Sequence, residues 1–197
     1  MTPPESPLPT LALDAALVLI DIQNGFDEPE WGRPSPAAAD AQENMRALAG
    51  RWVDTGRPVV VVRHDSRAPS SPLRPGQPGN DVVAWVDDLD AAVVVTKSVN
   101  SAFIGEPNLD GWLRERGIGQ VVLVGIQTNM CVETTARMGG NLGYDVIVPI
   151  DATSTFDLAG PDGAVMSAQD LARATATNLH GGGFAAVTDT AALLAST

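Results

Sequence analysis

Short runs of β-branched and aliphatic residues recur along the chain, and most of them end at a polar residue. Six such runs are present, at residues 15–20, 58–62, 91–95, 120–124, 145–150 and, more weakly, 184–187. A run that is apolar on both faces is typical of a strand in a parallel sheet whose two faces are covered. The sequence therefore predicts a six-stranded parallel sheet.

Helical patterns occupy the stretches between these runs. A helix predicted at 37–54 carries one apolar stripe, made of Ala41, Met45, Leu48 and Trp52. Further helices are predicted at 109–116, from about Cys131 to Gly143, and at 167–179. Alternating strands and helices predict an α/β fold, a three-layer sandwich with right-handed crossovers and helices on both faces.

A length of 197 residues fits one domain. We expect a single domain over residues 1–197, with the Pro-rich residues 1–12 as a flexible N-terminal extension. The segment 68–79 is rich in Pro, Gly and Ser and is long for a plain connector. A lid or interface loop and a disordered surface loop are equally compatible with it.

The charge balance limits the partners. Lys and Arg number 12 and Asp and Glu number 24, which gives a net charge of −12. A protein this acidic repels phosphate backbones and anionic membranes, so we expect a small-molecule substrate, no nucleic acid and no membrane. The N-terminus lacks a signal-peptide pattern, and the apolar runs are far shorter than a membrane helix. We expect a cytoplasmic protein.

Cys131 is the single cysteine of the chain. An intramolecular disulfide and a Cys-rich zinc site are therefore excluded. A lone cysteine is often a small buried hydrophobe. Because Cys131 lies near the predicted start of a helix, the helix dipole and free N–H groups there favour a thiolate and can bind an oxyanion.

Polar residues follow the predicted strands, and the carboxyl ends of parallel strands form one crevice. The residues placed there are Asp21, Arg63, His64, Lys97, the turn 125–131 and Asp151. A carboxylate, a thiol and an ammonium in this set can serve as base, nucleophile and stabilising cation. Each also has an ordinary structural explanation, such as a helix cap for Asp21 or a solvated charge for Lys97.

Three motifs give the chain a resemblance to a known family. They are LVLIDIQNGF at 17–26, TKSVNSAF at 96–103 and VGIQTNMCVETTAR at 124–137. Over about residues 15–191 the chain resembles the isochorismatase-like cysteine hydrolases, which include nicotinamidases, N-carbamoylsarcosine amidohydrolases and streptothricin hydrolase. The resemblance implies the sheet order 3-2-1-4-5-6, with strands one and four meeting at the switch point.

The resemblance also implies the site. Its catalytic triad would be Asp21, Lys97 and Cys131, with an oxyanion hole formed by the backbone N–H groups of Gln127 and Cys131. A cis peptide bond would join Ile126 to Gln127. The implied reaction is hydrolysis of a C–N bond in a small amide, carbamoyl or lactam compound through a thioester.

One departure from the family concerns the metal of nicotinamidases. Those enzymes hold it with an Asp-x-His pattern and a second His after strand two, whereas residues 61–72 here contain His64 alone. We therefore expect no catalytic metal and no other cofactor. The retained Cys131 favours C–N cleavage over an isochorismatase-type enol-ether hydrolysis that releases pyruvate. The intact triad argues against a catalytically silent binding module.

Substrate contacts are expected from residues that follow the motifs and strand two: Phe26, Trp31, Arg63, His64, Asn100 and Phe103. For the aromatic residues, core packing is an equally good explanation, and Arg63 can instead pair with a structural carboxylate. Members of the family form dimers or tetramers, so the resemblance implies a homodimer or homotetramer.

Overall fold

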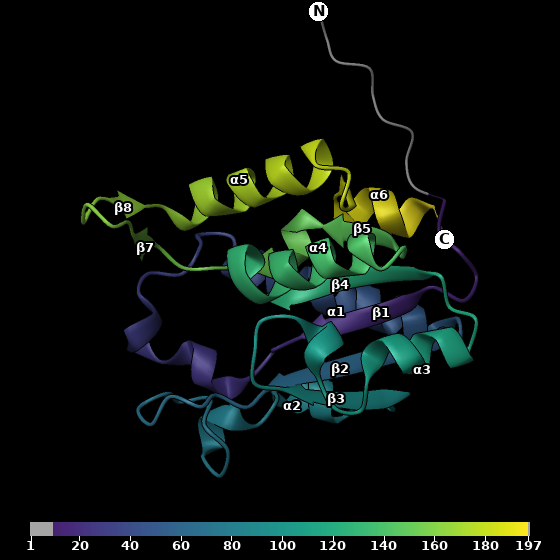
Figure 1. Cartoon of the computed structure of the whole chain (residues 1–197), viewed down its shortest axis with the longest axis horizontal. Coiled ribbons are helices and arrows are strands. Elements are labelled where there is room, and N and C mark those ends of the chain that lie inside the picture. The colour runs from purple at the N-terminus through teal and green to yellow at the C-terminus, as the bar shows by residue number, and fades with distance from the viewer. Residues whose placement is uncertain (1–9, 197) are drawn as a thin grey trace, which may run out of the picture.

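The computed structural model describes residues 10–196. Its centre is a parallel sheet in the order β3-β2-β1-β4-β5-β9 (Figure 1). The six strands are β1 (Ala16–Ile20), β2 (Val59–His64), β3 (Val93–Lys97), β4 (Gln120–Ile126), β5 (Asp145–Pro149) and β9 (Ala186–Thr188). A two-residue strand, β6 (Thr153–Ser154), adds to the end of β4. The predicted sheet order is confirmed.

Helices cover both faces of the sheet. One face is covered by α1 (Ala38–Asp54), α2 (Ala84–Asp87) and α6 (Thr190–Ala195). The other face is covered by α3 (Leu109–Glu115), α4 (Glu133–Asn141) and α5 (Ala168–Gly181). Alternate residues of β1 feed the two layers: Leu17 and Leu19 pack with the first set, and Val18 and Ile20 with the second. The predicted three-layer sandwich is confirmed.

The shortest helices and strands were not predicted from the sequence pattern. Helices α2 and α6, strand β6, and the hairpin of β7 (Leu158–Ala159) and β8 (Val165–Met166) were not expected. Single 3₁₀ turns also occur, at Asn24–Asp27, Pro29–Trp31, Pro78–Asn80, Ala102–Ile104 and Ile150–Ala152. These elements span too few residues to show a period of 2 or 3.6.

The third predicted helix begins later than expected. Cys131 lies in a π-helical turn, Thr128–Val132, and α4 starts only at Glu133. The turn carries the chain from the end of β4 into the helix.

The predicted extension at 1–12 lies mostly outside the described residues. Its last part is held against the body. Gln120 accepts the Ala12 N–H at 2.7 Å and donates to the Thr10 carbonyl at 3.0 Å, and Leu11 is buried. Residues 10–12 therefore belong to the packed part of the chain.

The Pro/Gly-rich segment 68–79 folds against the body as well. The carbonyl of Leu73 accepts hydrogen bonds from the Ser66 N–H and the Asn80 side chain, and the Leu73 side chain is buried. Within residues 10–196, none of the helices has both the length and the apolar character needed to cross a membrane.

Candidate active site

Three side chains meet at the carboxyl edge of the sheet. Asp21 follows β1, Lys97 ends β3, and Cys131 lies in the turn after β4. The Lys97 Nζ lies 2.6 Å from Asp21 Oδ2 and 3.4 Å from Cys131 Sγ. Because β2 separates β3 from β1, only a side chain as long as lysine can reach across to the Asp21 carboxylate.

The backbone at this edge is shaped to bring these groups together. Asp21 has φ +53°, a left-handed conformation that Asp adopts more readily than most residues. Opposite it, Gly125 has φ +128°, and a side chain there would collide with the carbonyl oxygen of Ile20. A glycine at this position lets β1 and β4 run side by side to the switch point, where the site lies.

Burial dominates the electrostatics. Asp21, Lys97 and Cys131 are 0, 2 and 8% exposed. Burial raises the pKa of the Asp21 carboxyl, and the Lys97 ammonium opposes this rise. Burial also raises the pKa of the Cys131 thiol to about 12, with the Asp21 charge adding to the rise and Lys97 opposing it.

The direction of this pKa shift opposes the thiolate that the start of a helix favours. Desolvation and the neighbouring carboxylate keep Cys131 protonated at neutral pH, and they outweigh the helix that begins two residues later. Proton transfer from the thiol must then accompany its attack. The buried Asp21 Oδ1 has no hydrogen-bond partner among the described residues, so it can accept that proton.

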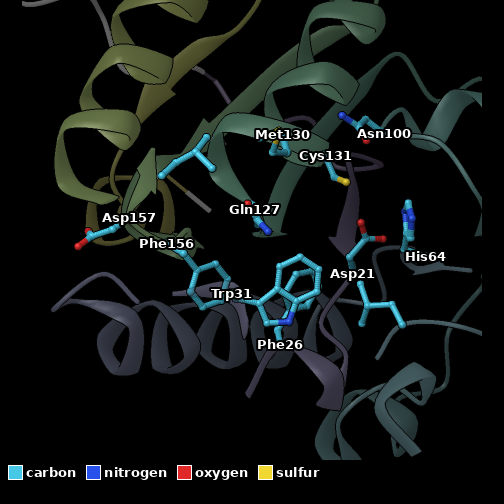
Figure 2. A pocket seen from close by; sticks show the side chains of 12 residues that line it. Asp21, Phe26, Trp31, His64, Asn100, Gln127, Met130, Cys131, Phe156 and Asp157 are labelled. Carbon is cyan, nitrogen blue, oxygen red and sulfur yellow. The ribbon is translucent and has the colours of Figure 1, made fainter. Parts of the chain in front are cut away.

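A cavity of about 360 Å³ opens above these groups (Figure 2). Its lining residues are Asp21, Phe26, Trp31, His64, Leu73, Asn100, Gln127, Met130, Cys131, Phe156, Asp157 and Leu158. One wall is aromatic: the Phe26 ring centroid lies 4.8 Å from Trp31 and 6.1 Å from Phe156. The Asp21 carboxyl and the Cys131 thiol thus lie beside an apolar wall, an arrangement that is common in sites for small molecules.

Comparison with known proteins places this arrangement in a family. A model of the isochorismatase domain matches residues 15–191. YrdC, an isochorismatase family protein of Bacillus subtilis, is 34% identical over 165 residues, which make up 84% of this chain and 87% of that protein. The chain belongs to the isochorismatase family.

Solved structures agree with this assignment. The crystal structure of an isochorismatase-family protein from Chromobacterium violaceum has a TM-score of 0.88 and 35% identity, and the match covers 97% of both chains. N-carbamoylsarcosine amidase from Thermoplasma acidophilum has a TM-score of 0.68 and 26% identity, over 90% of this chain and 96% of that one.

Relatives with named reactions are hydrolases. Streptothricin hydrolase of Streptomyces noursei is 31% identical over 75% of this chain and 52% of its own length. Nicotinamidase 1 of Arabidopsis thaliana is 30% identical over 72% of this chain and 70% of its own length. This isochorismatase-family chain is accordingly a hydrolase.

Four of the six expected substrate contacts line the cavity of this isochorismatase-family protein: Phe26, Trp31, His64 and Asn100. The other two, Arg63 and Phe103, do not line it. Arg63 points to the opposite side of β2 from His64, where it pairs with Asp65 at 3.1 Å. Phe103 is buried in the helix layer against Tyr144, with ring centroids 5.4 Å apart.

Five lining residues were missed: Leu73, Met130, Phe156, Asp157 and Leu158. Met130 directly precedes Cys131, the candidate nucleophile, and this position in the sequence could have predicted that it lines the cavity. The others come from the segment 68–79 and from the stretch after β6, where the conformation of irregular chain decides what faces the cavity.

The turn before Cys131 has the backbone that the resemblance implied. The Ile126–Gln127 peptide bond is cis. Gln127 and Cys131 both line the cavity (Figure 2).

A metal ion does not fit the residues present. Among residues 10–196, the donor atoms of Asp21, His64 and Cys131 lie within 4.8 Å of one another. The Lys97 ammonium, however, lies within 3.4 Å of an atom of each of the three. A metal would have to displace a cation that already contacts all the donors.

Proposed function

We propose that this isochorismatase-family hydrolase cleaves a C–N bond in a small amide, carbamoyl or lactam compound through a thioester on Cys131. The observation that carries the proposal is the Lys97 ammonium, which contacts both the Asp21 carboxylate and the Cys131 sulfur at the floor of the cavity. A base, a nucleophile and a cation are thus held within contact distance of each other.

In the first half of the reaction, the Asp21 carboxylate accepts the Cys131 proton while Sγ attacks the carbonyl carbon. The backbone N–H groups of Gln127 and Cys131 stabilise the oxyanion that forms. Asp21 then gives the proton to the leaving nitrogen, the C–N bond breaks, and an acyl thioester remains on Cys131.

In the second half, Asp21 takes a proton from a water molecule, whose oxygen attacks the thioester carbonyl. The C–S bond breaks, the proton returns to sulfur, and a carboxylic acid leaves. The raised pKa of Asp21, caused by burial, suits a group that must accept and return a proton twice. Lys97 keeps the carboxylate ionised between these transfers.

The cavity lining supports C–N cleavage over enol-ether cleavage. A substrate that releases pyruvate carries at least one carboxylate, which arginine or lysine normally binds. Among the described residues, the cavity lining includes no arginine or lysine, and the buried Lys97 is already paired with Asp21. An uncharged amide with an apolar group facing the Phe26 and Trp31 rings fits better.

A substrate panel tests this assignment. Uncharged amides, carbamoyl compounds and lactams small enough for about 360 Å³ are incubated with the protein, next to an enol-pyruvyl ether. We expect ammonia or amine release from at least one C–N compound, with no pyruvate from the ether. Pyruvate release would favour the enol-ether hydrolase, and the absence of both products would favour a silent binding module.

The control variant for the panel is Asp21→Asn. It keeps the volume of the side chain but removes the proton acceptor. It should abolish release of ammonia or amine from the same compound.

A further inference from the structure

His64 contacts the catalytic lysine from the neighbouring strand. It ends β2 and pairs in register with Lys97 at the end of β3. Its Nδ1 lies 3.1 Å from Lys97 Nζ (Figure 2 shows the ring beside Asp21). An ammonium has hydrogens and no lone pair, so Nδ1 must be the acceptor in this contact, and the ring proton of a neutral His64 must be on Nε2.

The contact completes the surroundings of the ammonium. Lys97 has three N–H groups, and three atoms surround Nζ at hydrogen-bond distance: Asp21 Oδ2, Cys131 Sγ and His64 Nδ1. With three acceptors fixed, the ammonium has one orientation and cannot swing away from the carboxylate or the sulfur.

The main chain of His64 is itself held in place by two buried amide side chains. Gln23 accepts the His64 N–H at 2.9 Å and donates to the His64 carbonyl at 3.1 Å. Asn80 donates to the same carbonyl at 3.0 Å. Such clamping sets the position of the imidazole before any substrate arrives.

The imidazole is uncharged at neutral pH. Burial and the Lys97 charge lower the pKa of His64, while the charges of Asp21 and Asp65 oppose this. Cys131, which also contacts the Lys97 ammonium, is a neutral thiol at that pH. His64 lines the cavity, and among the described residues its ring has one hydrogen-bond contact, that of Nδ1 with Lys97. A neutral N–H at a cavity wall matches a carbonyl oxygen better than a carboxylate.

We propose that His64 has two roles: its Nδ1 positions the Lys97 ammonium, and its Nε2–H binds an uncharged acceptor of the substrate, such as a second carbonyl oxygen beside the scissile amide. The second role rests on the proposed function and narrows its substrate to amides that carry such an acceptor. The first role concerns the resting protein and can be measured without turnover.

The tautomer is read by ¹⁵N NMR of the histidine-labelled protein at pH 7. The chain has two histidines, His64 and His180, so His180→Gln assigns the remaining signal. We expect His64 with a proton on Nε2 and a bare Nδ1. A proton on Nδ1, or an imidazolium, would overturn the proposal whether or not an amide is hydrolysed.

Two substitutions separate the roles. Asn places an acceptor near the Nδ1 position, and Gln places a donor near the Nε2 position. Alkylation of Cys131 by iodoacetamide reports on Lys97, since a displaced ammonium stabilises the thiolate less. The rate should stay within about twofold for His64→Asn and fall about tenfold for His64→Gln, as loss of one charge-assisted hydrogen bond predicts.

Turnover gives the complementary result. On an amide with a second carbonyl, His64→Asn should raise KM about tenfold, whereas on a matched amide without that carbonyl it should change KM little. Equal effects of Asn and Gln on both readouts, or no effect of either, would overturn the two roles. If the wild-type protein hydrolyses no amide, the proposed function and the substrate-binding role fail together, while NMR and alkylation still decide the positioning role.

Discussion

The ammonium of Lys97 joins three side chains that come from the ends of three other segments: β1, β2 and the turn after β4. Its charge is balanced by the Asp21 carboxylate at 2.6 Å, and both side chains are fully buried. A buried ion pair is costly to desolvate and is weak evidence for stability. Its position beside the only thiol of the chain makes a functional reason the better explanation.

The thiol of the free protein should react slowly. Burial raises the pKa of Cys131 to about 12, so the reactive thiolate is scarce at neutral pH and increases only as the pH approaches that value. The iodoacetamide alkylation rate, measured from pH 7 to 11, should therefore still be rising at pH 10–11. The same protein unfolded in guanidinium serves as the control and should level off near the ordinary thiol pKa of about 8.5. A folded-state plateau below pH 8 would contradict this assignment.

Sequence reasoning at the residue scale succeeded where position along a strand decides the outcome. Asp21 and Lys97 could be placed at the crevice because a run of apolar residues ends at each of them. The same reasoning could not tell which of Arg63 and His64 points to the cavity. Neighbouring residues of a strand point to opposite faces of the sheet, and which face each residue of β2 takes depends on how β2 pairs with its neighbours. The protonation state of Cys131 could not be predicted from the sequence either, since it depends on burial by distant segments.

At the scale of elements, the junction of β1 and β4 sets the geometry of the site. The two strands pair from Ala16 with Val121 to Ile20 with Gly125, and their ends carry Asp21 and the turn with Cys131. Apolar runs of five or six residues made these strands predictable. Strand β6 and the β7–β8 hairpin were not, because two-residue strands are fixed by tertiary contacts and carry no pattern of their own.

Gly125→Ala should damage this junction. The new methyl group would collide with the Ile20 carbonyl, and alanine is strained at φ +128°. We expect a loss of about 3 kcal/mol or more in the free energy of unfolding, measured by urea denaturation. Gly119→Ala, just before β4, is the matched control, because a methyl group there meets nothing within 4 Å. Equal stability of the two variants would show that β1 and β4 tolerate a side chain at their junction.

At the scale of the whole molecule, the cavity is assembled from distant parts of the chain. Phe26 and Trp31 follow β1, Leu73 comes from the segment 68–79, and Phe156 follows β6. These walls shape the cavity. Leu73 and Phe156 lie outside the named helices and strands, on chain whose path the sequence pattern does not show. Self-association into a dimer or tetramer and a cytoplasmic location stay predictions from the sequence.

Cys131 is the proposed nucleophile of a C–N hydrolase. The most direct measurement compares amine or ammonia release by the wild-type protein and by Cys131→Ala, on a compound that the wild-type protein hydrolyses. Circular dichroism should first show that the variant is folded. We expect the variant to lose about 10⁴-fold or more in kcat, as removal of a nucleophile does in other hydrolases. Turnover by the folded variant within tenfold of wild type would exclude Cys131 as the nucleophile.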